Sequence, residues 1–197
     1  MSTDNFRKHT HKNPIQKFLI FLFYRFVLAE VKKINPESIL DVGCGEGFTL
    51  RKIKDLGIGK KLEGIEYLDR AIQLGKEQNP DIHIKQGSIY KLPYKDNSFD
   101  LVICTEVLEH LEEPEKALQE LIRVSRKNLL LTVPNEPFFM LAQFLRGKNW
   151  SRWGNDIEHI NHWSALGFRQ FINKRIQVTV CKVPFFWTLI VALKGRR

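Results

Sequence analysis

Short apolar runs alternate with helix-like patterns through the middle of the chain, and this alternation limits the possible folds more than any other feature. Strands are predicted at residues 38–42, 62–66, 82–86, 99–105 and 128–133, and helices between them at 48–56, 69–78 and 114–125. Strand–helix alternation requires crossover connections, so we expect an α/β fold with a mainly parallel sheet and helices on both faces. The nearly continuous apolar character of the strands fits a sheet covered on both faces.

Two further strands are predicted near the end of the chain, at 177–183 and 186–193. Only Pro184 and Phe185 separate them, which is too few residues for a crossover, so they should form an antiparallel hairpin. No linker divides the sequence. We therefore expect one domain over 1–197, with a helical extension at 1–34 and a long insertion at 134–163.

The composition is that of a soluble globular protein, with 43% hydrophobic and 27% charged residues in a chain of 197. Its three cysteines, Cys44, Cys104 and Cys181, lie far apart and are odd in number. They form neither a disulfide framework nor a metal-binding spacing, which favours a reducing, cytoplasmic location.

The net charge of +9 is concentrated at the two ends of the chain. Residues 1–33 carry +5, residues 34–145 carry −4 and residues 146–197 carry +8. Basic ends could attract an anionic substrate, nucleic acid or an acidic lipid surface. A solvated basic surface is the favoured interpretation, because charge alone seldom identifies a partner.

The aromatic-rich segment 15–33 predicts an amphipathic helix. Its uninterrupted apolar run, 18–24, is far too short to span a bilayer. We expect this helix to cover an edge of the sheet. A peripheral membrane contact is the alternative, since aromatic bulk beside Lys and Arg suits a membrane interface.

The segment "ILDVGCGEGFTL" places Gly43, Gly45 and Gly47 between a strand and a helix, where open α/β sheets bind ligands. The spacing departs from the dinucleotide fingerprint G-x-G-x-x-G. Acidic residues at 41 and 46 oppose a pyrophosphate but suit a ligand with positive charge. Glu66 ends the second strand, where its carboxylate can accept both hydroxyls of a ribose. A ribose with a cation and no phosphate describes S-adenosylmethionine.

At these residues the sequence resembles the class I S-adenosylmethionine-dependent methyltransferases, in their small-molecule, type 11-like branch. "ILDVGCGEGFTL" is similar to the first motif of the family, "GIEYLDRAI" to the second, and "QGSIYKLPYKDNSFDLVICTEVLEHL" to the third and fourth. The resemblance implies a Rossmann-like sheet of seven strands in the order 3-2-1-4-5-7-6, with strand 7 antiparallel. It also implies S-adenosylmethionine as cofactor and S-adenosylhomocysteine as product.

The resemblance assigns one set of residues to the cofactor: Asp41, Gly43, Cys44, Gly45, Glu66, Tyr67, Ser88, Ile89 and Thr105. The glycines would lie against the cofactor, Asp41 would support the loop or reach the methionine end, and Glu66 would hold the ribose. Ser88 and Ile89 would flank the adenine, and Thr105 would approach the methionine. Many relatives have an aspartate where this chain has Ser88, which casts doubt on the strength of cofactor binding.

The predicted activity is in-line methyl transfer to a small-molecule acceptor, directed to oxygen or carbon. Such transfer mainly needs alignment and desolvation, with a base where the acceptor is a poor nucleophile. The catalytic candidates are Glu106, His110 and His162, with Glu109 and His159 as further candidate bases. Glu106, Glu109 and His110 would share one face if "EVLEH" is helical. This pattern, with His159 and His162, resembles the metal sites of small-RNA and ubiquinone-pathway O-methyltransferases, but the favoured interpretation has no metal.

The insertion 134–163 is rich in Phe, Trp, Arg and Lys, and we expect it to form an acceptor lid over the carboxyl edge of the sheet. Part of it could equally be an ordinary amphipathic helix. Two other functions stay open: an RNA methyltransferase that uses the basic ends, and a non-catalytic cofactor-binding or membrane-associated module. A dinucleotide-dependent oxidoreductase is disfavoured by the glycine spacing and the acidic loop.

Overall fold

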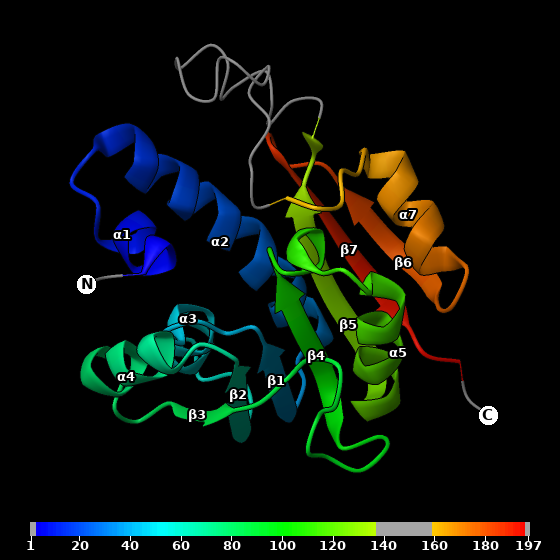
Figure 1. The fold of residues 1–197 in the computed structure, drawn as a ribbon, viewed down its shortest axis with the longest axis horizontal. Helices are drawn as coiled ribbons and strands as arrows, with labels where there is room; N and C mark the ends of the chain where they lie inside the picture. The colour runs from blue at the N-terminus through cyan, green and yellow to red at the C-terminus, as the bar shows by residue number, and fades with distance from the viewer. Residues whose placement is uncertain (1–2, 137–158, 196–197) are drawn as a thin grey trace.

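The computed structural model describes residues 3–136 and 159–195, and these residues build a seven-stranded sheet (Figure 1). The strands are β1 (Ser38–Val42), β2 (Lys61–Glu66), β3 (His83–Gln86), β4 (Phe99–Thr105), β5 (Ser125–Pro134), β6 (Gln177–Lys182) and β7 (Trp187–Leu193). Their order is β3-β2-β1-β4-β5-β7-β6, and β7 runs antiparallel to both its neighbours. The other pairs are parallel. The predicted sheet, its order and its terminal hairpin are confirmed.

Helices cover both faces of the sheet. On one face lie α2 (Pro14–Ile34), α3 (Phe48–Asp55) and α4 (Asp69–Gln78); on the other lie α5 (Pro114–Val124) and α7 (Ala165–Asn173). Each face buries its own apolar cluster, and the largest fully buried side chains include Phe99 and Phe168. The helices predicted at 48–56, 69–78 and 114–125 all form. The helical extension expected at 1–34 did not distinguish the short helix α1 (Asp4–Thr10) from α2, and the sequence did not predict α7 or the 3₁₀ turn η1 (Leu108–His110).

The long helix α2 lies across a face of the sheet rather than only at its edge, so the expected edge cover was wrong. Its fully buried Val27 and Val31 pack in the cluster that includes residues of the central strands. Packing against the central strands removes more apolar area of the helix from water than packing at a sheet edge would. The buried carboxylate of Glu30 then reaches the edge strand β6, where Lys182 Nζ approaches to 2.6 Å.

The amino-terminal half of α2 is different, because Phe18 and Phe21 are both more than half exposed. Among the described residues, no helix has the length and apolar character needed to cross a membrane. The peripheral membrane contact through 15–33 stays a prediction. Most of the expected acceptor lid, 137–158, lies outside the described residues.

Candidate functional site

The glycine loop 43–47 turns the chain sharply between β1 and α3. Gly43, Gly45 and Gly47 all have positive φ, at 75°, 54° and 80°. The amides of Gly43 and Cys44 both donate to the carbonyl of Ile65, at 2.8 and 3.1 Å, which fastens the loop to β2. A Cβ at Gly43 would overlap Val107 Cγ2. The chain's own packing therefore requires glycine at position 43, in addition to any need for close ligand approach.

Cys44 belongs to the same loop, but its thiol points into the protein. Its Sγ lies against Gly64 on β2, where a Cβ would come within 2.5 Å of it. Any contact that Cys44 makes with a cofactor would therefore come from its main chain.

Glu66, at the end of β2, connects the glycine loop to the start of α4. Its Oε2 accepts from the Gly45 amide at 2.8 Å, and its Oε1 accepts from the amides of Tyr67 and Leu68 at 2.8 and 2.9 Å. A carboxylate has about four acceptor positions, and these three bonds leave one of them, on Oε2, for a ribose hydroxyl. Tyr67 follows with a largely exposed ring.

Asp41, near the end of β1, carries a buried carboxylate that the described residues leave unsatisfied. Its side chain is 1% exposed, and neither oxygen has a hydrogen-bond partner among those residues. Burial, with a smaller effect from Glu66, raises its pKa to about 7. An unpaired buried carboxylate is costly, so this position suits a ligand that brings hydrogen-bond donors or positive charge. The residues at this edge thus fit a nucleoside that carries an ammonium and a sulfonium.

The remaining predicted cofactor positions lie at the same, carboxyl edge of the sheet. Ser88 and Ile89 follow the end of β3, and Thr105 ends β4. Ile89 is buried, and Ser88 Oγ accepts weakly from the Tyr90 amide at 3.3 Å. The structure therefore places all nine predicted cofactor residues around the ends of four neighbouring parallel strands.

The short helix α1 lies against the glycine loop, which the sequence did not indicate. Thr3 Oγ1 and Asn5 Nδ2 both donate to the carboxylate of Glu46, which is fully buried. The His9 ring stacks on Phe48 with centroids 4.3 Å apart. A Cβ at Gly45 would come within 2.6 Å of Asn5 Nδ2. The acid at position 46, which we interpreted as favouring a cationic ligand, instead binds α1.

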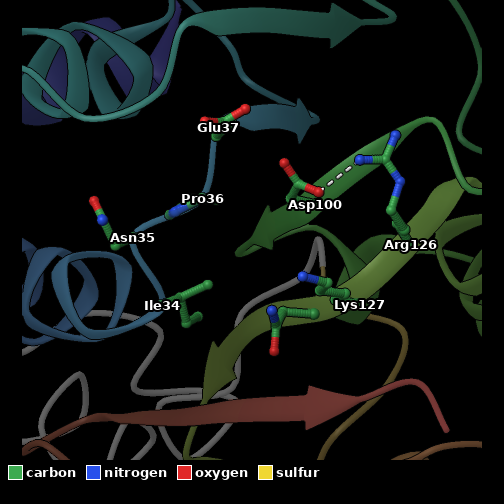
Figure 2. Close-up of a pocket in the computed structure, with 8 residues that line it drawn as sticks. Ile34, Asn35, Pro36, Glu37, Asp100, Arg126 and Lys127 are labelled. Atoms are coloured by element: carbon green, nitrogen blue, oxygen red, sulfur yellow. Dashed lines mark hydrogen bonds and ion pairs between the residues drawn. The ribbon is translucent and has the colours of Figure 1, made fainter. Parts of the chain in front are cut away.

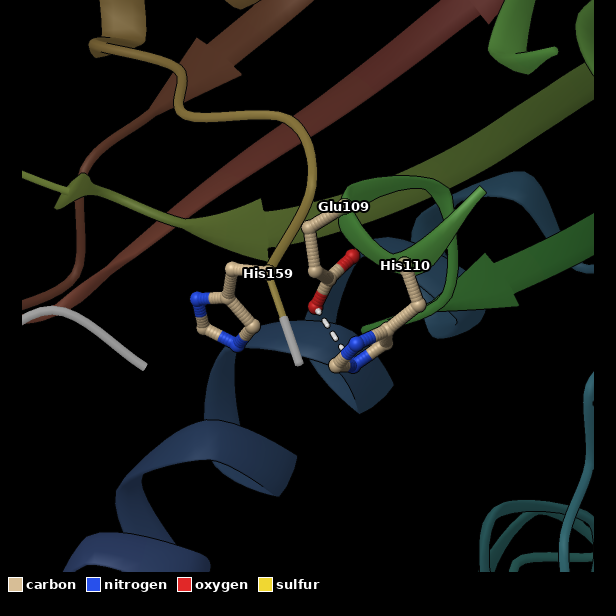
Figure 3. A group of neighbouring side chains, drawn as sticks. All are labelled: Glu109, His110 and His159. Atoms are coloured by element: carbon tan, nitrogen blue, oxygen red, sulfur yellow. Dashed lines mark ion pairs between the residues drawn. The ribbon is translucent and has the colours of Figure 1, made fainter. Parts of the chain in front are cut away.

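Acidic and imidazole side chains gather just beyond β4 (Figure 3). Glu106 directly follows the strand at a φ of 56°, and its Oε1 accepts from Thr132 Oγ1 at 2.9 Å. Glu109 and His110 lie in the 3₁₀ turn η1, so the expectation of one α-helical face was wrong. The main chain at Glu106 is left-handed, which ends regular structure before η1 begins. Burial raises the pKa of Glu106 to about 7; burial and the charge of Glu106 raise that of Glu109.

Glu136 joins this group from the end of β5, and sequence reasoning missed it. Its carboxylate is 3% exposed, and Oε1 lies 2.6 Å from His159 Nδ1 and 3.5 Å from His162 Nδ1. No local pattern marks Glu136, because its partners come from a segment more than twenty residues later. The predicted catalytic residues Glu106 and His110 thus lie in this group with partly exposed side chains, and so does His162.

A surface pocket of about 240 Å³ lies at the opposite edge of the sheet (Figure 2). It is lined by residues that precede or begin strands, including Glu37, Asp100 and Lys127. Asp100 is already satisfied there, by Arg126 Nη1 at 2.8 Å and by Ser38. The glycine loop and the acidic group do not line this pocket.

Comparison with known proteins places this geometry in context. Residues 40–132 match the family model described as a methyltransferase domain. The chain is 32% identical to demethylmenaquinone methyltransferase of Renibacterium salmoninarum over 109 residues, covering 55% of this chain and 45% of that protein. It is 37% identical to norajmaline N-methyltransferase of Rauvolfia serpentina over 115 residues, covering 55% and 36%. The matches thus span less than half the length of these relatives.

A solved structure has the same fold over almost the whole chain. Magnesium protoporphyrin IX methyltransferase from Synechocystis, determined with bound S-adenosylhomocysteine, superposes with a TM-score of 0.72 at 16% identity. The superposition covers 96% of this chain and 92% of that one. The matched domain, the relatives and the sheet order agree on a class I S-adenosylmethionine-dependent methyltransferase domain over residues 40–132, with S-adenosylmethionine as its cofactor.

Proposed function

We propose that this protein transfers a methyl group from S-adenosylmethionine to an oxygen or carbon atom of a small-molecule acceptor. The names of its relatives support a small acceptor: one is named for demethylmenaquinone, another for norajmaline, and the superposed structure for magnesium protoporphyrin IX. The norajmaline enzyme is named for transfer to nitrogen, so the acceptor atom needs a direct test.

The observation that carries the proposal is the partly buried carboxylate of Glu106, one residue beyond the predicted cofactor contact Thr105. The cofactor, when bound, supplies a methyl group on a sulfonium that departs as a neutral thioether. The chain must then align the acceptor, exclude water and take up the proton that a hydroxyl or carbon acid loses. Glu106 is oriented by Thr132 and is positioned to accept that proton.

The test has a binding step and a transfer step. Calorimetry with S-adenosylhomocysteine establishes cofactor binding. Label from S-[methyl-³H]adenosylmethionine is then followed into separate pools of phenols and quinols, carbon acids, amines and RNA. Glu106→Gln should keep S-adenosylhomocysteine affinity within about twofold and lower turnover on an oxygen or carbon acceptor by about 10²–10⁴-fold.

Glu112→Gln is the matched control, because Glu112 is exposed and lies six residues further along. It should leave both measurements unchanged. Labelling of amines alone, or full turnover by Glu106→Gln, would contradict the proposal.

RNA is the second candidate acceptor, and the basic ends of the chain favour it. An RNA substrate would bind with an affinity that falls steeply as salt rises. Label in the RNA pool together with such a slope would establish this alternative. Tight cofactor binding with no label in any pool would instead indicate a non-catalytic module.

A further inference from the structure

We propose that Glu109, His110 and His159 form a binding site for one divalent first-row metal ion, of the Mn²⁺ or Zn²⁺ type. One ligand atom from each of these residues lies within 4.8 Å of the other two. Figure 3 shows the three side chains directed toward a common point between η1 and the loop that precedes α7. Ligands on one ion lie about 3.4 Å apart, so small side-chain rotations would complete the site.

The carboxylate of Glu109 is the buried charge that a metal ion would pair. Its side chain is 1% exposed, and neither oxygen has a hydrogen-bond partner among the described residues. His110 Nε2 lies 3.9 Å from Oε1 and carries a positive charge only when it is protonated. Buried charges are normally paired or bound to a metal. The buried Glu136 and the partly buried Glu106 add further acids around it, which increases the need for positive charge.

His159 is held in the orientation that a metal ligand needs. Its Nδ1 lies 2.6 Å from Glu136 Oε1, so Nε2 is the nitrogen directed to the ion. A carboxylate on the second nitrogen is the usual support for a metal-binding histidine, because it fixes the ring and raises its basicity.

The main chain also fixes His159 next to Glu109. The carbonyl of Glu109 accepts from the amides of Ile160 and Asn161 at 2.8 and 2.9 Å. Asn161 Nδ2 donates to the carbonyls of Leu108 and Leu111 at 3.2 and 2.6 Å. Two segments fifty residues apart are thus joined by four hydrogen bonds at the proposed site, so its main-chain framework exists before an ion arrives.

The ligand types select the metal. Imidazole nitrogen suits Fe²⁺ and Zn²⁺, and the carboxylate also suits Mn²⁺, whereas Mg²⁺ and Ca²⁺ prefer all-oxygen sites. Three protein ligands leave a coordination position open, as in catalytic zinc sites. In the proposed function this position would take an acceptor oxygen. That role depends on the proposed function, whereas metal binding itself does not.

The experiment measures binding of the metal alone to the full chain, after chelator treatment and removal of the chelator. Calorimetric titration with MnCl₂ and with ZnCl₂ should show one ion per chain. Glu109→Gln and His110→Ala should each weaken binding at least tenfold. The matched controls Glu112→Gln and His83→Ala, both at exposed positions, should bind as the wild type does.

His110 is only partly buried, so His110→Ala tests the site even if Glu109→Gln fails to fold. S-adenosylhomocysteine affinity, measured on the same samples, reports separately on the fold and the cofactor site. Absence of Mn²⁺ and Zn²⁺ binding by folded wild-type protein would overturn the proposal. Equal binding by wild type and His110→Ala would also overturn it.

Discussion

The carboxylate of Glu66 accepts a hydrogen bond from the main-chain amide of Gly45, 2.8 Å away, while its other oxygen accepts from the first amides after β2. One side chain thus fixes the position of two loops at the predicted cofactor site. The ribose assigned to Glu66 would bind a group that the protein has already oriented.

Glu66→Gln should weaken S-adenosylhomocysteine binding by about 1–3 kcal/mol, because the amide group of Gln would face main-chain N–H donors and accept fewer hydrogen bonds. Calorimetry measures this loss. The matched variant Glu77→Gln changes an exposed acid of α4 and should bind normally. Unchanged affinity in Glu66→Gln would refute the assignment of the ribose to this residue.

Gly43→Ala should destabilise the fold more than Gly57→Ala. Both glycines have positive φ, but a Cβ at Gly57 meets nothing within 4 Å, whereas one at Gly43 meets Val107. We expect a loss of about 1–2 kcal/mol at Gly57 from backbone strain, and about 1–3 kcal/mol more at Gly43 from overlap.

Urea denaturation measures both losses. Adding Val107→Ala to Gly43→Ala should recover part of the additional loss, compared with Val107→Ala alone. Equal losses at Gly43 and Gly57 would show that the contact with Val107 is unimportant.

Asp41 should make the cofactor-free protein less stable as pH rises. Its pKa is about 7 in the folded chain and about 3.9 in an unfolded one, so the folded state holds the proton more tightly. The stability that this proton provides is complete below about pH 4 and is lost as pH rises through 7.

Asp41→Asn cannot titrate and should remove this dependence. Between pH 5 and 7 the wild type should lose up to about 1.4 kcal/mol per pH unit relative to the variant. Urea denaturation at several pH values gives the comparison. Parallel pH profiles for the two proteins would rule out a raised pKa at Asp41.

Removing the two side chains that donate to Glu46, Thr3 just before α1 and Asn5 within it, should release α1 from the glycine loop. In Thr3→Ala/Asn5→Ala the buried Glu46 carboxylate loses both hydrogen bonds from this helix. Trypsin should then cleave after Arg7 and Lys8 several times faster. Thr10→Ala is the control, because Thr10 bonds only within α1, to the Phe6 carbonyl. Equal cleavage rates in the two variants would show that Glu46 does not hold α1.

Much of the framework follows from local pattern. β1 and β4 occupy 38–42 and 99–105 as predicted, because continuous apolar runs bounded by polar turns leave little choice of boundary. Their order in the sheet, by contrast, came from the family resemblance. The cofactor residues were assigned by the same resemblance, and they gather at one edge because parallel strands bring their ends together there.

The parts that were missed depend on contacts between distant residues. α1 has a polar sequence with no apolar stripe, and its position follows from the buried Glu46 some forty residues later. The main chain at Glu106 has a positive φ of 56°, and the residue types around it do not predict this conformation. Glu136 has His159 as its hydrogen-bond partner only because a segment 23 residues later in the chain folds back beside it.

Segment 137–158 is preceded and followed by residues fastened to the same edge of the sheet. Asn135 and Glu136 donate to the carbonyls of Phe186 and Trp163, and Ile160 and Asn161 donate to that of Glu109. Because these hydrogen bonds lie outside 137–158, substitutions or changes of length within that segment should leave Glu109, Glu136 and His159 in their present positions. We expect 137–158 to contact the acceptor, and on that expectation selectivity for the acceptor can change while the anchored acids and imidazoles stay the same.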